Sequence, residues 1–326
     1  MTRHALLLSV ALAAPALPAL AEVPRVLADT PVTAALVQQV MGELGQPEAL
    51  LAAGSDPHHY QLRPSQARSL QDADLLVWVG PALTPWLERP AAGLAARGAA
   101  LALLEQPGTQ LRDFAGGDEH EHEHEHEHEH EHEHEDHAGH HGHDHGDDGH
   151  HHSGLDPHAW LDPYNAATWV QGIAAALSQR DPDHAETYAA NASKAAAEIA
   201  ALDGALKAQL APVQGKRFVV FHDAYGYFTD HYGLQPAIAV SLGDASTPSA
   251  ARLKTIRDQI AAEGAACAFP EANHDPRLIA AVTEGSATRA GAALDPEGST
   301  AEPGAALYAT LLRGMAAALA DCLGQE

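Results

Sequence analysis

Residues 183–210 constrain the fold most, because this alanine-rich stretch contains no proline and only one glycine, Gly204. Its composition favours an uninterrupted helix. At 1.5 Å per residue, such a helix would be about 42 Å long, roughly the diameter of a small domain. A single parallel sheet does not need a crossover helix of this length. We therefore expect a connector that spans two lobes, the alternative being an ordinary crossover helix with frayed ends.

Apolar runs and helical patterns alternate on both sides of this stretch. The run 73–80 (ADLLVWVG) is continuously apolar between Asp and Gly, as in a buried parallel strand. Strands separated by helices indicate βαβ units. We expect strands at 25–29, 73–80, 99–104, 217–221, 235–240, 265–270 and 290–294, and helices at 33–44, 64–72, 83–96, 165–179, 249–263, 277–286 and 305–323.

The sequence thus predicts an α/β protein with two lobes, each a mostly parallel β-sheet flanked by helices, joined by one long connecting helix. A length of 326 residues suggests about two domains, and a hydrophobic fraction of 45% supports a sizeable core. We expect an amino-terminal lobe at 22–181, the connecting helix at 182–212 and a carboxy-terminal lobe at 213–326.

The first 21 residues have the pattern of a secretory signal peptide. A short basic start with Arg3 precedes an apolar run at 5–20, and Ala19-Leu20-Ala21 is an A-x-A cleavage pattern. A membrane anchor is the alternative, but the run is shorter than the roughly 20 residues that a comfortable span needs. We expect removal of the leader near Ala21 and export of a soluble protein.

The chain contains two cysteines, Cys267 and Cys322. An even count in an exported protein favours a disulfide. Closing a loop of this length stabilises a protein by about 4 kcal/mol in the chain-entropy model. Two buried free thiols are the alternative.

Charge is concentrated in residues 118–152, which hold 14 Asp and Glu, 16 His and no Lys or Arg, in a chain of net charge −26. An acidic chain without a basic stripe is a poor partner for nucleic acid or anionic membranes, and we expect it to attract a divalent cation. The segment lacks the apolar residues of a core and is expected to be disordered. Its repeated H-E-x-x-H matches overlap and do not indicate a metalloprotease.

We interpret this segment as a low-affinity zinc collector or a sensor of zinc excess, the alternative being a solvated loop without a role. Its candidate auxiliary ligands are His120, His122, His124, His126, His128, His130, His132, His134, His137, His140, His141, His143, His145, His150, His151 and His152.

Three other histidines occupy loops or strand ends. His58 lies in the turn-rich GSDPHHY, His158 follows a proline in DPHAWLDP, and His222 follows the strand 217–221. Asp295 comes directly after the strand 290–294. Three imidazoles and one carboxylate form a donor set suited to Zn²⁺. We expect the remaining histidines to be neighbours, surface or capping residues: His59, His184, His231 and His274.

These motifs together resemble a family. GSDPHHYQLRPSQARSLQDADLLVWVGP, DPHAWLDP, FHDAYGYF and GAALDPEGS are similar, in this order, to the ZnuA-type periplasmic zinc-binding proteins of ABC importers. The resemblance implies a bilobed fold with a rigid connecting helix, a periplasmic location and a metal held between the lobes. It places the three histidine ligands at His58, His158 and His222, with Asp295 or water fourth. Manganese members carry Glu where this chain has His222, and nitrogen there favours zinc.

The resemblance also implies partners: a zinc ABC permease with its cytoplasmic ATPase, and as a further candidate a periplasmic zinc chaperone. We expect a monomer without enzymatic activity. Three alternatives remain open: an exported zinc hydrolase, for which Glu271 would be the nearest general base; a zinc buffering or storage protein; and the same fold serving Mn²⁺ or Ni²⁺.

Overall fold

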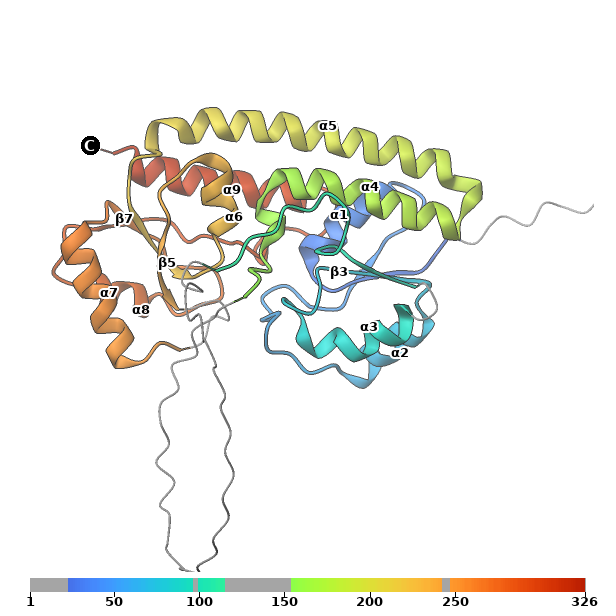
Figure 1. Cartoon of the computed structure of the whole chain (residues 1–326), viewed down its shortest axis with the longest axis horizontal. Helices are drawn as coiled ribbons and strands as arrows, with labels where there is room; N and C mark the ends of the chain where they lie inside the picture. The colour runs from blue at the N-terminus through green and yellow to red at the C-terminus, as the bar shows by residue number, and fades with distance from the viewer. Residues whose placement is uncertain (1–22, 96–98, 115–153, 242–246, 326) are drawn as a thin grey trace, which may run out of the picture.

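The computed structural model describes residues 23–95, 99–114, 154–241 and 247–325 (Figure 1). The expected signal peptide and the acidic histidine-rich segment, with all its candidate auxiliary ligands, lie outside the described residues. Within these ranges, no helix is both long enough and apolar enough to cross a membrane.

The first sheet is parallel and has the strand order β2-β1-β3-β4. All four residues of β3 are buried, as expected for a continuous apolar run in a parallel sheet. The strands are β1 (Val26–Ala28), β2 (Glu48–Ala49), β3 (Leu75–Trp78) and β4 (Ala100–Ala102). The helices of this part are α1 (Pro31–Met41), α2 (Pro64–Asp72) and α3 (Glu88–Ala95), the last preceded by the 3-10 turn η1 (Pro85–Leu87).

The second sheet repeats this arrangement, with parallel strands in the order β6-β5-β7-β8. Its strands are β5 (Phe218–His222), β6 (Ile238–Ser241), β7 (Cys267–Ala268) and β8 (Arg289–Ala290). The helices that follow its strands are α6 (Gly226–Tyr232), α7 (Ala250–Glu263), α8 (Arg277–Thr283) and α9 (Leu307–Leu323).

The strand expected at 290–294 is present but shorter, and it begins one residue earlier. β8 ends at Ala290, and Leu294 forms only an isolated parallel bridge with Glu271. The intervening residues are glycine and alanine, which have low strand preference and bury little surface in a sheet. β2, a two-residue edge strand held by pairing with β1, was not expected from the sequence.

A long helical segment joins the two parts, as expected. α5 (Ala185–Leu210) runs between the 3-10 turns η3 (Pro182–His184) and η4 (Ala211–Val213). Its 26 residues reach about 39 Å, and Figure 1 shows it extending over both lobes. α5 packs on α1, α9 and the antiparallel α4 (Pro163–Arg180). The buried positions of α5 recur every three or four residues: Tyr188, Ala192, Ala195, Ile199, Leu202, Leu206 and Leu210.

One hydrophobic core is continuous through both lobes. It includes residues of the first sheet such as Val77, of the second sheet such as Val220, and of the helices between them. Two smaller clusters fill the opposite faces, one beneath α2 and α3 and the other beneath α7 and α8. Each sheet therefore has helices on both faces, and the two sheets share their central packing.

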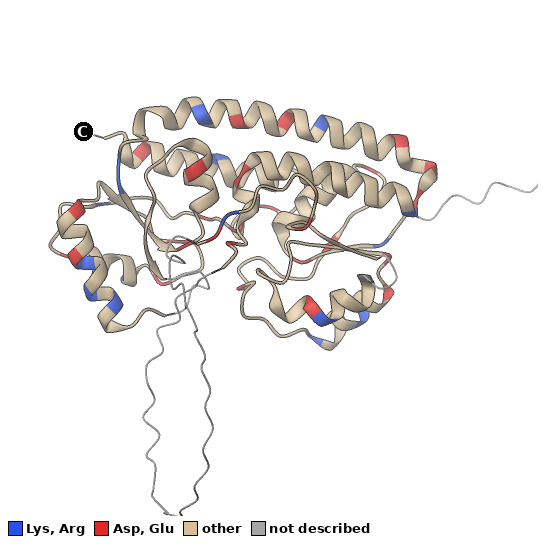
Figure 2. Ribbon diagram, viewed as in Figure 1, with Lys and Arg blue, Asp and Glu red and all other residues tan. Residues whose placement is uncertain are grey.

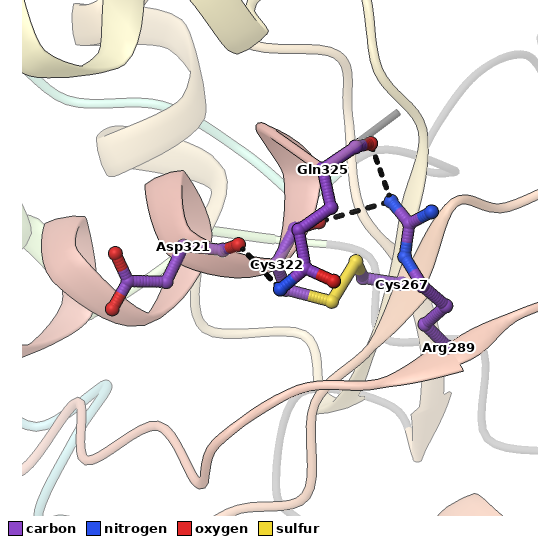
Figure 3. Close-up of a disulfide and its surroundings, with 5 residues drawn as sticks. All are labelled: Cys267, Arg289, Asp321, Cys322 and Gln325. Atoms are coloured by element: carbon purple, nitrogen blue, oxygen red, sulfur yellow. Dashed lines mark hydrogen bonds between the residues drawn. A yellow bond between two sulfur atoms is a disulfide. The ribbon is translucent and has the colours of Figure 1, made fainter.

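The expected disulfide is present. Cys267 of β7 is bonded to Cys322 in the last turn of α9 (Figure 3). Arg289 of β8 donates to the carbonyl oxygens of Cys322 and Gln325, at 3.0 and 2.9 Å. A covalent bond and a charged donor thus fix the end of α9 to the second sheet.

Acidic and basic residues are interspersed along α5 (Figure 2).

Candidate metal centre

His58, His158 and His222 converge from separate parts of the chain. Each histidine contributes one ring nitrogen to the group, and these three nitrogens lie within 4.8 Å of one another. The ring centroids of His58 and His158 are 5.5 Å apart, and those of His158 and His222 are 5.3 Å apart. His158 and His222 are each 1% exposed. Three imidazoles whose ring nitrogens lie this close together are a donor set for Zn²⁺.

Two copies of the same local motif position the first two histidines. In Asp56-Pro57-His58 the Asp Oδ1 accepts the backbone N–H of His58 at 2.8 Å, and in Asp156-Pro157-His158 the equivalent bond is 3.0 Å long. Asp side chains form such turns with the backbone two residues ahead. Each motif therefore folds its loop locally and fixes where the histidine leaves the backbone.

Asp156 also orients the ring of His158. Its Oδ1 lies 2.8 Å from His158 Nδ1, and because an ionised carboxylate only accepts, Nδ1 carries the proton. The lone pair is then on Nε2, which is buried and has no hydrogen-bond partner among the residues described. A carboxylate behind an imidazole is the usual way in which proteins prepare a histidine for zinc.

Glu271 performs the same task for His222. Its Oε2 accepts from His222 Nδ1 at 2.5 Å, and its Oε1 accepts from the hydroxyl of Tyr225 at 2.5 Å. Nε2 of His222 is buried and lacks a hydrogen-bond partner within the described ranges. Burial alone would lower the pKa of His222, but the charge of Glu271 outweighs it and raises the pKa to about 9.

His222 lies at the end of β5 and Glu271 follows β7, the adjacent strand. The chain reverses its winding direction between these two strands, since β6 lies on one side of β5 and β7 on the other. Ligand sites of parallel α/β sheets lie at such switch points, beyond the carboxyl ends of the strands. The fold thus places the His222–Glu271 pair where this architecture binds ligands.

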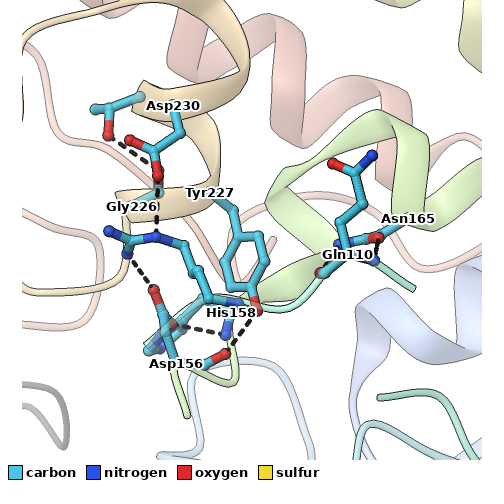
Figure 4. Close-up of polar contacts among 9 residues, drawn as sticks. Gln110, Asp156, His158, Asn165, Gly226, Tyr227 and Asp230 are labelled. Carbon is cyan, nitrogen blue, oxygen red and sulfur yellow. Dashed lines mark hydrogen bonds and ion pairs between the residues drawn. The ribbon is translucent and has the colours of Figure 1, made fainter. Parts of the chain in front are cut away.

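Arg112 connects the loop of His158 in the first lobe to α6. Its Nη1 donates to Asp156 Oδ2 at 2.7 Å and its Nε donates to Asp230 Oδ2 at 3.1 Å. Its backbone N–H donates to the hydroxyl of Tyr227, which itself donates to the carbonyl oxygen of Asp156. Figure 4 shows Asp156 and His158 facing Tyr227 and Asp230 of α6.

Gly226 makes room for this contact, because a Cβ there would lie 1.4 Å from Arg112 Nη1. Residues 112 and 156 are also joined through their backbones, Asp156 N–H donating to the Arg112 carbonyl oxygen, and an antiparallel bridge pairs Asp113 with Leu155. The segments that flank residues 115–153 are therefore paired immediately before the loop of His158.

Asp295 is not part of the three-histidine group. Its Oδ1 accepts from the backbone N–H and hydroxyl of Ser299, and its Oδ2 accepts from the same two groups of Thr300, at 2.6 to 2.9 Å. Both oxygens are thus engaged in closing a local turn. The carboxyl of the nearby Glu297 is half-buried, and its pKa is raised to about 8, chiefly by desolvation.

Of the other histidines, His59 lies against Asp56 and is exposed, and His184 is bonded to Asp181. His231 of α6 bridges two carboxylates, with Nδ1 2.8 Å from Asp162 and Nε2 2.7 Å from Asp203. A hydrogen bond to Asp162 raises the pKa of His231, with a further contribution from Asp203, in spite of partial burial.

Sequence reasoning missed Asp156 and Glu271 as residues that orient the candidate ligands His158 and His222. The repeated Asp-Pro-His motif was a local signal for Asp156. Glu271 was considered only as a general base, and its pairing with His222 joins residues 49 positions apart.

Two parallel sheets with a buried imidazole cluster between them define a bilobed α/β metal-binding protein. The family described as "Zinc-uptake complex component A periplasmic", or ZnuA, matches residues 26–322. The chain belongs to this family, which confirms the resemblance found in the sequence.

Curated relatives agree. The chain is 73% identical over 321 residues to the high-affinity zinc uptake system protein ZnuA of Paracoccus denitrificans (strain Pd 1222), covering 98% of both proteins. It is 36% identical over 297 residues to the protein of the same description from Brucella suis biovar 1 (strain 1330), covering 89% of each.

Solved structures share the fold. A crystal structure of ZnuA superposes with a TM-score of 0.70 at 22% identity, covering 92% of this chain and 99% of that one. A manganese-bound mutant of a periplasmic metal-binding protein from Candidatus Liberibacter asiaticus gives a TM-score of 0.72 at 19% identity, with coverage of 92% and 99%.

Proposed function

We propose that this protein captures one Zn²⁺ ion with His58, His158 and His222 and delivers it to the membrane permease of a zinc ABC importer. The convergence of three imidazoles, two of them with buried and unbonded Nε2 atoms among the residues described, carries the proposal. Family membership supports zinc uptake in the periplasm. Removal of the leader near Ala21 is part of the same proposal. The permease and its cytoplasmic ATPase, and a zinc chaperone, are the proposed partners.

We further propose that a solvent molecule, and not Asp295, completes the shell. Asp295 already accepts four hydrogen bonds, so ligation would cost the turn at Ser299 and Thr300. Asp295→Asn should then leave zinc affinity within about threefold of the native value, well below the 10- to 100-fold that loss of an outer partner of a metal ligand costs. A loss above that range would identify Asp295 as a ligand.

The ligand set is tested by titrating zinc into the mature full-length chain against a strong chelator. Replacing any one of the three histidines by alanine should weaken the tightest site by more than about 100-fold, because even outer partners contribute 10- to 100-fold. His59→Ala is the matched control, since His59 adjoins His58 but is exposed and bonded to Asp56. Native affinity in all three variants would contradict the proposal.

Binding without catalysis is favoured by the state of Glu271. Glu271, the nearest candidate for a general base, accepts hydrogen bonds from His222 and Tyr225, and we assign it the role of orienting His222. The chain is accordingly proposed to be a solute-binding protein and not a zinc hydrolase. Hydrolysis of ester or peptide substrates by the zinc-loaded protein would contradict this.

The chain's division into a lobe at 22–181, a connecting helix at 182–212 and a lobe at 213–326 belongs to the same proposal. Ligands from both lobes would make metal occupancy sensitive to the contacts between the lobes.

The acidic segment 118–152 is proposed as an auxiliary zinc collector. Stoichiometry separates capture from storage: one ion retained against a strong chelator supports capture, whereas only many weak sites would support storage. Competition by Mn²⁺ or Ni²⁺ tests the metal, and nitrogen donors predict that manganese fails.

A further inference from the structure

A fourth imidazole lies next to the three-histidine centre. The ring centroids of His222 and His274 are 6.2 Å apart, compared with 5.5 Å for His58 and His158 and 5.3 Å for His158 and His222. His158 and His222 are buried, whereas the side chain of His274 is 28% exposed. The imidazole cluster therefore extends from the three-histidine centre to a histidine that solvent reaches.

His274 belongs to a second group of possible metal donors. The group consists of one potential ligand atom from each of His222, Glu271 and His274, and these three atoms lie within 4.8 Å of one another. His274 Nε2 is 3.8 Å from Glu271 Oε2. Two ligands of a tetrahedral zinc are about 3.3 Å apart at ordinary bond lengths, so an ion between these two atoms requires a shift of only a few tenths of an ångström.

Local structure holds His274 in this place. Its ring stacks on Phe221, with centroids 4.1 Å apart and planes inclined by 23°. Its backbone N–H donates to the carbonyl oxygen of Glu271 in a turn where Asn273 has a φ of 67°. Asparagine is among the few residues that adopt this conformation readily. The imidazole is therefore presented to Glu271 by the turn itself.

Glu271 has capacity for an ion as well as for its present partners. A carboxylate offers about four acceptor sites. Oε2 accepts from His222 and Oε1 accepts from Tyr225. A cation beside His274 would meet a buried carboxylate that lies next to a ligand of the inner centre.

We propose that His274 and Glu271, together with His222, form an outer zinc position through which the ion enters and leaves the three-histidine centre. The inference rests on the proposed function of that centre. His222 is common to both donor groups, so an ion can exchange ligands one at a time without first returning to water. Zinc sometimes expands its shell from four to five ligands, as such an exchange requires. The outer position acts on the rate of transfer and not on the affinity of the inner centre.

The test compares full-length protein carrying one equivalent of zinc with its His274→Ala and His274→Gln variants. Glutamine approximates the size of histidine and can hold the turn, but it is a poor zinc ligand. Zinc release into excess chelator and zinc uptake by metal-free protein are followed by stopped flow. Both rates should fall about tenfold in both variants, the effect of losing about 1.4 kcal/mol of transition-state stabilisation. The equilibrium affinity should stay within about twofold of native, since equal changes in both rates cancel.

His184→Ala is the control, because His184 is also paired with a carboxylate, Asp181, but belongs to the turn before α5. Unchanged rates in both His274 variants would overturn the outer position. A fall in affinity without matched changes in the two rates would also overturn it, because this would indicate a structural role for His274.

Anomalous diffraction at the zinc edge separates this inference from the proposed function. Crystals with one equivalent of zinc should show the ion among His58, His158 and His222 in the native protein and in His274→Ala. Absence of this peak from the native protein would reject the three-histidine centre itself. Its presence together with native transfer rates in the variants would reject only the outer position.

Discussion

Removal of the Arg112 side chain should weaken zinc binding although Arg112 is not expected to touch the ion. Arg112 donates to the buried carboxylate of Asp156, and the other oxygen of that carboxylate accepts from His158 Nδ1. Arg112→Ala would leave Asp156 without its cationic partner. The carboxylate could then turn toward other donors, and the ring of His158 would lose its fixed orientation.

The expected magnitude follows from burial. The Asp156 side chain is 0% exposed and that of Arg112 is 21% exposed. Breaking a buried ion pair by removing one partner costs about 3–5 kcal/mol of stability. Zinc affinity should fall by about 10- to 100-fold, the usual effect of disturbing an outer partner of a metal ligand.

Two variants serve as controls in chelator competition and in denaturant unfolding. Asp230→Asn removes the charge of the second partner of Arg112. The side chain of Asp230 is 64% exposed, so this change should alter stability by no more than about 1 kcal/mol. Arg112→Lys keeps the charge but not the planar fork, and should give an intermediate loss of affinity. The reasoning is refuted if folded Arg112→Ala binds zinc as tightly as Asp230→Asn.

Three more perturbations test other parts of the molecule. Glu271→Gln should lower zinc affinity by about 10- to 100-fold, because the ring of His222 loses its charged acceptor, and chelator competition measures this. His231→Gln should destabilise the fold by about 1–2 kcal/mol at pH 6, a figure reduced for partial exposure. Because the pKa of His231 is raised in the folded state, this contribution is complete below the unfolded pKa and disappears as pH rises through the folded pKa. Denaturant unfolding at pH 6 and at higher pH should therefore show the unfolding free energies of variant and native protein converging as pH rises. Reduction of the disulfide, which joins residues 55 positions apart, should lower the free energy of unfolding by about 4 kcal/mol, as denaturation with and without a reductant would show.

Regular elements with strong local patterns were predictable from the sequence. α2 has the expected bounds, because proline favours a helix start and the alanine after Asp72 begins an apolar strand. β2 was not predicted, because Glu48 and Ala49 have no strand pattern and are extended only through pairing with β1. The run 290–294 was overestimated because its apolar residues are too small to hold a strand in the sheet. Tertiary contacts decided both cases.

The site was predictable to a similar extent. Loops and strand ends with histidine located the imidazoles that the fold brings together. Asp295 was selected by the same rule, but Ser299 and Thr300 follow it closely and supply four donors to its carboxylate. Serine and threonine shortly after an aspartate are a local signal for a side-chain turn, which competes with metal ligation. The sequence therefore contained a signal for this turn that the choice of Asp295 did not use, and ligation by Asp295 stays a prediction.

The continuity of the core determines which parts of the molecule can move when metal binds. One hydrophobic cluster includes both sheets and the helices α1, α4, α5 and α9, so rotation of one lobe against the other would open packed apolar surface at about 25 cal/mol per Å². The loop that carries His58 lies outside the helices and strands and contains a hydrogen bond from the His58 backbone N–H to Asp56. The residues that directly follow His158 are instead buried in the core cluster. Arg112 spans the junction, since it contacts Asp156 in the loop of His158 and Asp230 on α6 of the second lobe. Movements that accompany loading and release therefore cost less in the loop of His58 than in that of His158, and the Arg112–Asp156 contact links the His158 loop to the second lobe.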